Sequence, residues 1–295
     1  MKAQVAIMAL LKLKNIRKSN LREIIETSDL FNKDLNELYE IVREKLKSSQ
    51  NFNEWKKIYK ISSNEFLQAE LFDIKIITIL DKEFPDQLKK IPDPPMILFG
   101  KGDISLLKFP SQVAVVGTRY PTSYGSQLSY EISSQLTQNS ILIVSGLALG
   151  IDTQAHLGCL QNQGKTISVL SHGLDYIYPP ENKVLAQKII DNGGLLLSEY
   201  PPGTKPKKFR FLARNRIQSG LSQAVVVIEA KKGGGTTTTI KHCIKQGKIL
   251  YCVNPGNEGN KADFAANFFF IENGNAKSLE NGEIQDLLQD IRNTN

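Results

Sequence analysis

The chain has 295 residues, of which 41% are apolar and 23% charged, so it can bury the cores of one large and one smaller domain. Its longest apolar run, residues 141 to 151, is about half of the roughly 20 residues that a transmembrane helix needs, which argues against a membrane span. The 37 lysines and arginines outnumber the 30 acids and leave a net charge of +7, which favours a polyanionic partner without identifying it.

The cysteines and histidines predict neither a disulfide framework nor a metal site. The three cysteines form no C-x-x-C pair and lie in apolar or helical surroundings. No two of the three histidines stand at ligand spacing on one expected face. We therefore expect a protein of the reducing cytoplasm that holds no metal and no cofactor.

Residues 1–68 predict a small all-helical domain. Apolar positions recur there at helical spacing, as in Leu21, Ile24 and Ile25. The first 15 residues combine a lysine with an apolar patch but contain no small-residue cleavage site. We therefore expect a first helix there rather than a signal peptide.

Residues 69–110 predict a connector between two domains. A β-rich run at 72–81 is followed by Pro92, Pro94 and Pro95, a composition typical of an extended segment. We place the domain boundary here, so that 111–295 forms the large domain.

Residues 111–295 predict a doubly wound, mostly parallel α/β fold of the Rossmann type. Continuous apolar runs separated by segments of helical pattern indicate strands that are covered by helices on both faces. The runs are 113–117, 141–146, 166–170, 195–199, 224–230 and 249–253. Ligands bind such sheets beyond the carboxyl ends of the strands, so the loops after these runs are the candidate functional segments.

The loop after the first run predicts a phosphate contact. A dinucleotide-binding fingerprint would need G-x-G-x-x-G here, and only Gly117 is in place. Instead Thr118, Arg119 and Thr122 offer hydroxyls and a guanidinium just before a helix that we expect to begin near Ser123, which suits a phosphate. A tight turn with capping hydroxyls and a solvated arginine would explain the same residues.

The next two loops give weaker indications of a functional site. In 145–156, Asp152 or Thr153 can cap a helix in which His156 is a packed side chain, and Ser145 has no partner for nucleophilic catalysis. In 171–185, Lys183 lies in the first turn of a helix, where an anionic ligand or plain solvent exposure would relieve its repulsion by the helix dipole.

The stretch KPKKFRFLARNR at 205–216 carries six cations, two phenylalanines and no acid. If its centre is extended, Phe209 and Phe211 lie on one side and Lys208 and Arg210 on the other, as in a plain amphipathic edge strand. Cations that follow a backbone beside a ring that stacks on a base would suit single-stranded nucleic acid.

The end of the same stretch predicts a helix start. We expect Arg214, Asn215 and Arg216 to open a helix, where two cations at its positive end favour an anion. The loop at 231–242, with three glycines and four threonines, suits either a phosphate contact or a flexible connector.

Seven motifs follow one another through the large domain. They are G-T-R-x-x-T-x-Y-G (117–125), S-G-x-A-x-G-I-D-x-x-A-H (145–156), G-L-D-x-x-Y-P-x-x-N (173–182), L-S-E-Y-P-P-G (197–203), F-x-x-R-N-R-I (211–217), V-V-x-E-A (226–230) and N-P-G (254–256). Each is weak alone, but in their order and spacing they resemble the DNA-processing protein A family, also called DprA or Smf. The preceding FPDQLKKIPDPPMILFGKGD resembles the connector of the same family.

The resemblance implies a single-stranded-DNA-binding protein of bacterial natural transformation. Such a protein protects incoming strands, loads the RecA recombinase onto them and catalyses no reaction. It has an N-terminal helical domain like a sterile alpha motif (SAM), followed by an extended Rossmann-like domain that forms a homodimer.

The motifs also imply a DNA-binding pocket. Its anion contacts would come from Arg119 with the Gly117–Thr118 backbone and from the pair Lys208 and Phe211, while 214–216 would shape the wall. The full set of candidates is Gly117, Thr118, Arg119, Thr122, Lys183, Lys208, Phe211, Arg214, Asn215 and Arg216.

Two segments depart from the family pattern. Residues 233–239 read GGGTTTT where the family usually has S-G-S-L-x-T-A, so a DNA contact is not carried over to this loop. After residue 256 the usual small-residue motif is replaced by FAANFFFIENGNAK, and we expect none of the C-terminal winged-helix domain that many members carry.

Two enzyme classes remain as alternatives. The nucleoside-monophosphate phosphoribohydrolases of the lysine-decarboxylase-like group carry G-G-x-G-T-x-x-E, and this chain lacks one spacer and has Thr239 where the catalytic acid should stand. A nicotinamide oxidoreductase is suggested by the fold alone, and the glycine fingerprint that it needs is missing.

Overall fold

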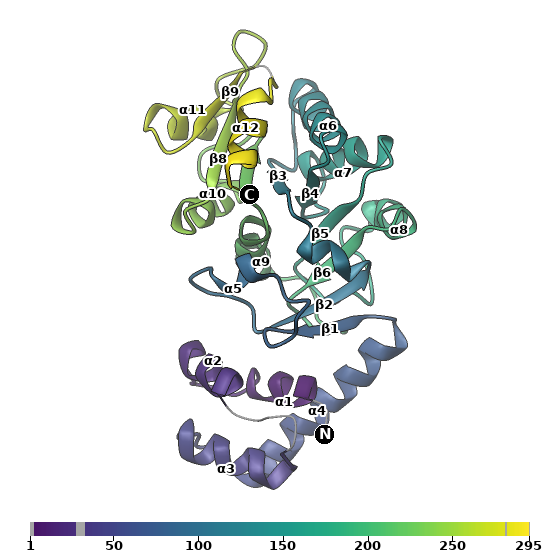
Figure 1. The fold of residues 1–295 in the computed structure, drawn as a ribbon, viewed down its shortest axis with the longest axis vertical. Coiled ribbons are helices and arrows are strands. Elements are labelled where there is room, and N and C mark those ends of the chain that lie inside the picture. The colour runs from purple at the N-terminus through teal and green to yellow at the C-terminus, as the bar shows by residue number, and fades with distance from the viewer. Residues whose placement is uncertain (1–2, 28–32, 281, 295) are drawn as a thin grey trace.

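The computed structural model describes residues 3–27, 33–280 and 282–294, and its strands form a single sheet (Figure 1). The order of the nine strands is β1-β2-β6-β5-β4-β3-β7-β8-β9. They are β1 Lys75–Thr78, β2 Ile97–Gly102, β3 Gln112–Val116, β4 Leu142–Ser145, β5 Thr166–Leu170, β6 Leu195–Ser198, β7 Ala224–Val227, β8 Ile249–Asn254 and β9 Lys277–Glu280. All neighbours from β6 to β9 are parallel, and β2 pairs antiparallel with β1 and β6, so the expected mostly parallel fold is confirmed.

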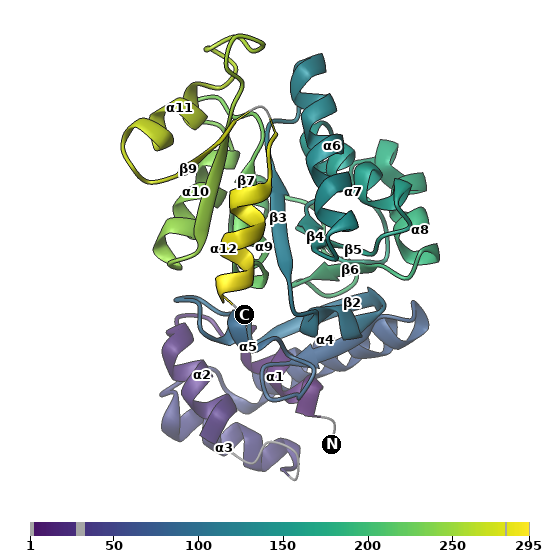
Figure 2. The same cartoon turned by 45° about the horizontal axis from the view of Figure 1, so that its top comes forward.

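Helices cover both faces of the sheet (Figure 2). They are α5 Asp86–Lys89, α6 Ser123–Gln138, α7 Ile151–Gln161, α8 Lys183–Asp191, α9 Lys208–Leu221, α10 Thr236–Lys245, α11 Ala265–Glu272 and α12 Gln285–Thr294, with 3₁₀ turns at Ile104–Lys108 and Pro180–Asn182. Alternate side chains of β3 point to opposite faces: Val113 and Val115 pack against α6 and α7, while Ala114 and Val116 share a cluster with α9 and α10. Continuous apolar strands are therefore buried on both sides.

The N-terminal segment is helical, as expected. Its helices are α1 Ala3–Leu10, α2 Lys18–Thr27, α3 Leu35–Lys45 and α4 Phe52–Leu71, drawn in purple and blue below β1 in Figure 1. The α1 sequence AQVAIMAL is apolar except for Gln4, and its apolar residues are buried between α4 and the β1–β2 edge of the sheet. Within the residues described here, no helix combines the length and the apolar character that a membrane crossing requires.

The segment expected to be a connector contributes two strands to the sheet. One apolar cluster contains Ile7 and Trp55 from the helices and Leu98 and Leu197 from β2 and β6, so the helical segment and the sheet share a core. Helix α4 also runs to Leu71, past the expected boundary. A division of the chain at 68 and 110 stays a prediction.

The strand order places a topological switch point at the centre of the sheet. The chain winds outward from β3 through β4 and β5 to β6, then crosses back to β7 on the other side of β3. The loops that follow β3 and β7 therefore diverge, and a crevice opens between them at the carboxyl end of the sheet.

The stretch 205–216 differs from its expected conformation. Helix α9 begins at Lys208, so an extended KFRFL was wrong, and Arg214 to Arg216 lie inside the helix rather than at its start. Pro206 and the extended Lys207 precede a run in which Arg and Leu recur, together with single Lys, Ala and Gln residues, and all five types are good helix formers. In a helix the side chains repeat every 3.6 residues instead of every two as in a strand, so Phe209 and Phe211 lie on different faces of α9.

Candidate nucleic-acid interface

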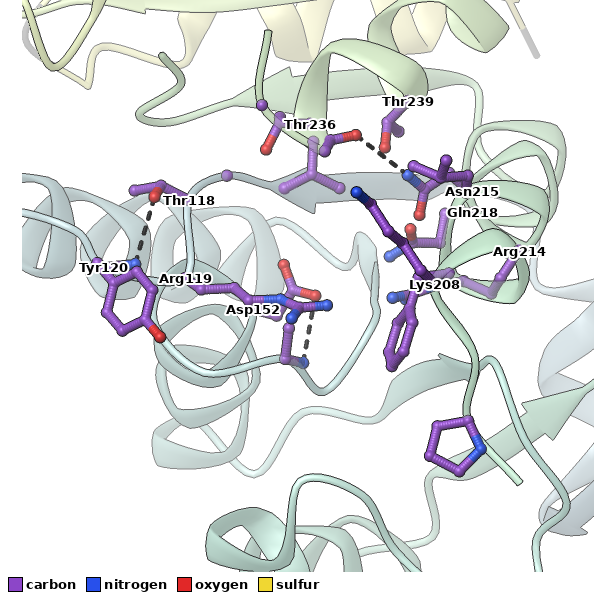
Figure 3. Close-up of a pocket in the computed structure, with 18 of the residues that line it drawn as sticks. Thr118, Arg119, Tyr120, Asp152, Lys208, Arg214, Asn215, Gln218, Thr236 and Thr239 are labelled. Atoms are coloured by element: carbon purple, nitrogen blue, oxygen red, sulfur yellow. Dashed lines mark hydrogen bonds between the residues drawn. The ribbon is translucent and has the colours of Figure 1, made fainter. Parts of the chain in front are cut away.

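A pocket of about 770 Å³ lies at the switch point (Figure 3). Loops after five successive parallel strands line it: Gly117–Tyr120 after β3, Ala148 and Asp152 after β4, Tyr178 after β5, residues 206–218 after β6, and 231–239 after β7. Seven of the ten candidate residues belong to its lining, namely Gly117, Thr118, Arg119, Lys208, Phe211, Arg214 and Asn215.

Two exposed cations enter the pocket from opposite walls. Arg119 extends from the β3 loop and Lys208 from the first turn of α9 (Figure 3). The Arg119 guanidinium carbon lies 4.9 Å from the ring centroid of Phe211, close enough for a cation–π contact. Among the residues described, no carboxylate forms an ion pair with Arg119 or Lys208. Both charges are therefore available to a ligand.

A third cation, Arg214, forms part of the floor. Its residue is 5% exposed, and Nη1 donates to the Val169 carbonyl at 2.8 Å. It fits only because Gly146 has no side chain, since a Cβ there would lie 1.6 Å from Nη1. Burial lowers the pKa of Arg214 to about 10, although the neighbouring Asp152 opposes this, so the floor stays positively charged at neutral pH.

Thr122 does not line the pocket. Its hydroxyl donates to buried Glu229 at 2.7 Å and accepts from the Gly125 N–H at 3.0 Å, which caps α6. Glu229 accepts a second hydrogen bond from the Thr122 backbone N–H at 3.0 Å. Thr122 thus holds the turn that presents Arg119, and α6 begins at Ser123 as expected.

Arg216 and Lys183 also lie outside the pocket lining. The Arg216 side chain is 5% exposed and binds both carboxylate oxygens of Glu199, at 2.9 and 2.6 Å, and Asp93 at 3.1 Å. Burial alone would lower the pKa of Arg216, but Glu199 and Asp93 together raise it. Lys183 is exposed at the start of α8.

Residues 75–292 match the family described as DNA recombination-mediator protein A. The chain belongs to this family. It is 38% identical over 219 residues to DNA processing protein DprA of Bacillus subtilis, covering 74% of this chain and 73% of that protein. It is 47% identical over 190 residues to the Streptococcus pneumoniae DprA, covering 64% and 66% respectively.

Two solved structures of family members have the same fold. The X-ray structure of DprA from Streptococcus pneumoniae aligns with a TM-score of 0.79 at 33% identity, covering 99% of this chain and 98% of that one. DNA processing protein A from Helicobacter pylori, a structure that concerns a unique single-stranded DNA binding mode, aligns with a TM-score of 0.65 at 33% identity, covering 75% and 97%. The resemblance seen in the motifs is thereby confirmed. The family match begins at Lys75 and so includes β1 and β2.

Several lining residues of this family member were not among the sequence-based candidates. Tyr178 is 41% exposed, and its ring centroid lies 6.1 Å from that of Phe211. Asp152 was expected to act as a cap, but Gly150 is the N-cap of α7 and Asp152 lies against Arg214 under the pocket, where burial raises its pKa. The available indication was that Tyr178 lies in the loop that follows the parallel strand β5.

The interpretation of His156 as a packed side chain is confirmed. It is fully buried, and its Nδ1 lies 2.9 Å from the Thr166 hydroxyl. Burial lowers its pKa to about 3, so it is neutral at physiological pH. Within 3–27, 33–280 and 282–294, no group of three or more His, Cys, Asp or Glu side chains is placed to hold a metal ion.

Proposed function

We propose that this chain binds single-stranded DNA in the pocket at the switch point. The observation that carries the proposal is that Arg119 and Lys208 enter one pocket, where Arg119 lies over a half-buried Phe211 ring and neither cation has an acidic partner among the residues described. Phosphates would contact the cations and a base would stack on the ring, the combination that single-strand-binding proteins use. The single-stranded DNA binding mode described for the Helicobacter pylori relative supports the same role.

The chemistry of the pocket favours a single strand over a duplex. A ring recessed among loops can reach the face of a base only when that base is unpaired and unstacked from a partner strand. The buried Arg214 below the pocket adds a fixed positive charge that supports phosphate binding without side-chain reordering. Gly235 has open space where a Cβ would stand, so its backbone can approach the ligand closely, whereas the Cβ position of Gly117 lies 2.5 Å from the packed Ile151 side chain.

We expect tighter binding of an oligothymidine than of a duplex of equal length, and affinity that falls as salt rises. Each neutralised phosphate contributes about −0.7 to the slope of log affinity against log salt. Contacts from Arg119 and Lys208 therefore predict a negative slope with a magnitude of about 1.4 or more. Fluorescence anisotropy titrations between about 50 and 200 mM salt measure both quantities. Equal affinity for the two DNA forms would contradict the proposal.

We further propose that the protein acts in natural transformation as a cytoplasmic homodimer that protects incoming strands and loads RecA onto them. Family membership supports this assignment. Light scattering of the purified chain tests the dimer. RecA-dependent strand exchange on DNA already covered by single-strand-binding protein, with and without the chain, tests the loading role, and no acceleration would refute it.

The competing enzyme class can be tested directly. Gly234 and Thr239 line the pocket, which is where a phosphoribohydrolase would hold its nucleotide. The acid of that class is replaced by Thr239, whose residue is 2% exposed, so we infer that no glycosidic bond is cleaved. Adenosine monophosphate incubated with the protein should release no adenine on chromatography, and release that grows with enzyme concentration would establish the enzyme instead.

A further inference from the structure

The first turn of α9 separates the pocket from a second cationic and aromatic surface. Lys208 and Phe211 face the pocket, as their positions one turn apart require. Five residues that do not line the pocket cluster beside the same segment, and we call them the outer surface: Tyr176, Tyr200, Lys205, Phe209 and Arg210.

Cations and rings alternate across the outer surface. The Arg210 guanidinium carbon lies 5.1 Å from the ring centroid of Tyr200 and 5.4 Å from that of Phe209. Lys205 Nζ lies 4.9 Å from the ring centroid of Tyr176, and Arg210 Nη1 donates to the Lys205 carbonyl. Phe209 is 60% exposed, so a large apolar ring faces solvent beside the Arg210 guanidinium.

Among the residues described, the acids beside the outer surface form no ion pair with its cations. Both oxygens of Glu199 bind Arg216, and Asp175 accepts from the Gly203 N–H at 2.9 Å. In the part of the chain that the structure describes, Lys205 and Arg210 form no ion pair. Neither cation is therefore neutralised by an ion pair among these residues, although the nearby Asp175 carboxylate keeps its negative charge beside Tyr176.

We propose that the outer surface binds a second stretch of the same single-stranded DNA, which crosses the first turn of α9 after leaving the pocket. This inference rests on the proposed function. Pro206, Lys207 and Lys208 line the pocket, and Lys205 and Phe209 flank them in the chain, so one strand can pass from one surface to the other. Cations beside an exposed ring fit phosphates beside a base, whereas an acidic peptide would use the cations alone.

The test uses two oligothymidines, one of about 5 nucleotides that fills the pocket and one of about 16 that can extend beyond it, within the usual site sizes of single-strand-binding folds. Phe209→Ala should weaken binding of the long oligonucleotide by about 5- to 150-fold, the range for loss of one base stack. Binding of the short one should not change. Phe72→Ala, which removes an exposed ring at the end of α4, is the matched control and should affect neither.

A second readout isolates the charges. Arg210→Ala should reduce the magnitude of the salt slope by about 0.7 for the long oligonucleotide only, since one phosphate contact is lost. Lys60→Ala, an exposed lysine of α4, serves as the control. Circular dichroism and urea unfolding verify that each variant folds. If Arg210→Ala does not fold, Lys205→Ala is used in its place.

The outcomes separate the two proposals. Wild-type protein that binds neither oligonucleotide would overturn the proposed function and this inference together. Variants that bind the long oligonucleotide as tightly as wild type would overturn this inference alone. Equal losses for both lengths would also overturn it, because Phe209 and Arg210 would then act on the pocket. If Phe209→Ala also weakened the binding of a long strand whose distal nucleotides lack bases, the lost affinity could not come from base stacking.

Discussion

Replacing Arg119 by alanine is expected to weaken binding of single-stranded DNA by about 1.5 to 3 kcal/mol, the contribution of one charge-assisted hydrogen bond. This corresponds to roughly 10- to 150-fold in the dissociation constant. The effect should be large because no acid among the described residues pairs with Arg119 and holds it away from a phosphate, and because Arg119 lies over the Phe211 ring that would receive a base. Anisotropy titration with a short oligothymidine measures the loss.

Two further variants make the Arg119 result specific. Arg119→Lys keeps the charge but loses the planar, two-pronged donor and its contact with the ring, so its affinity should fall between wild type and alanine. Arg292→Ala removes an exposed arginine from the last turn of α12 and should bind like wild type. If a correctly folded Arg119→Ala protein bound DNA with unchanged affinity, Arg119 would not belong to the interface.

The second large effect is expected on stability rather than on binding. Arg216→Met should lower the free energy of unfolding by about 3 to 5 kcal/mol, because it leaves the Glu199 carboxylate without its two-pronged partner. Glu199 is 20% exposed and Asp93 48% exposed, so partial solvation places the expected value at the lower end. Urea unfolding followed by circular dichroism gives the difference.

A double variant identifies the cause. Arg216→Met combined with Glu199→Leu should recover much of the lost stability, since an apolar pair of similar volume no longer buries an uncompensated charge. Under conditions where Arg216→Met is folded, its DNA affinity should match wild type. A loss comparable to that of Arg119→Ala, with stability unchanged, would instead restore Arg216 to the binding set that its motif implies.

The amino-acid sequence by itself predicted strands β3 to β8 and the edge of the sheet where we propose that DNA binds. Apolar runs such as 113–117 and 224–230 can be buried on both faces only within a parallel sheet, which identified β3 and β7 and directed attention to the loops after them. Arg119 was found in this way because it directly follows a strand. These features could be predicted because the apolar pattern that defines a strand lies within one short segment of the chain.

Tertiary structure alone decided the conformation of 205–216 and where its charged side chains lie. A run of alternating cations and rings fits either a strand or a helix, and packing of Ile217 and Leu221 against the sheet selects the helix. That choice places Lys208 in the pocket, turns Phe209 outward and buries Arg216 against Glu199. Partners such as these come from distant segments, and the burial that sets their charge and exposure arises only when those segments pack together.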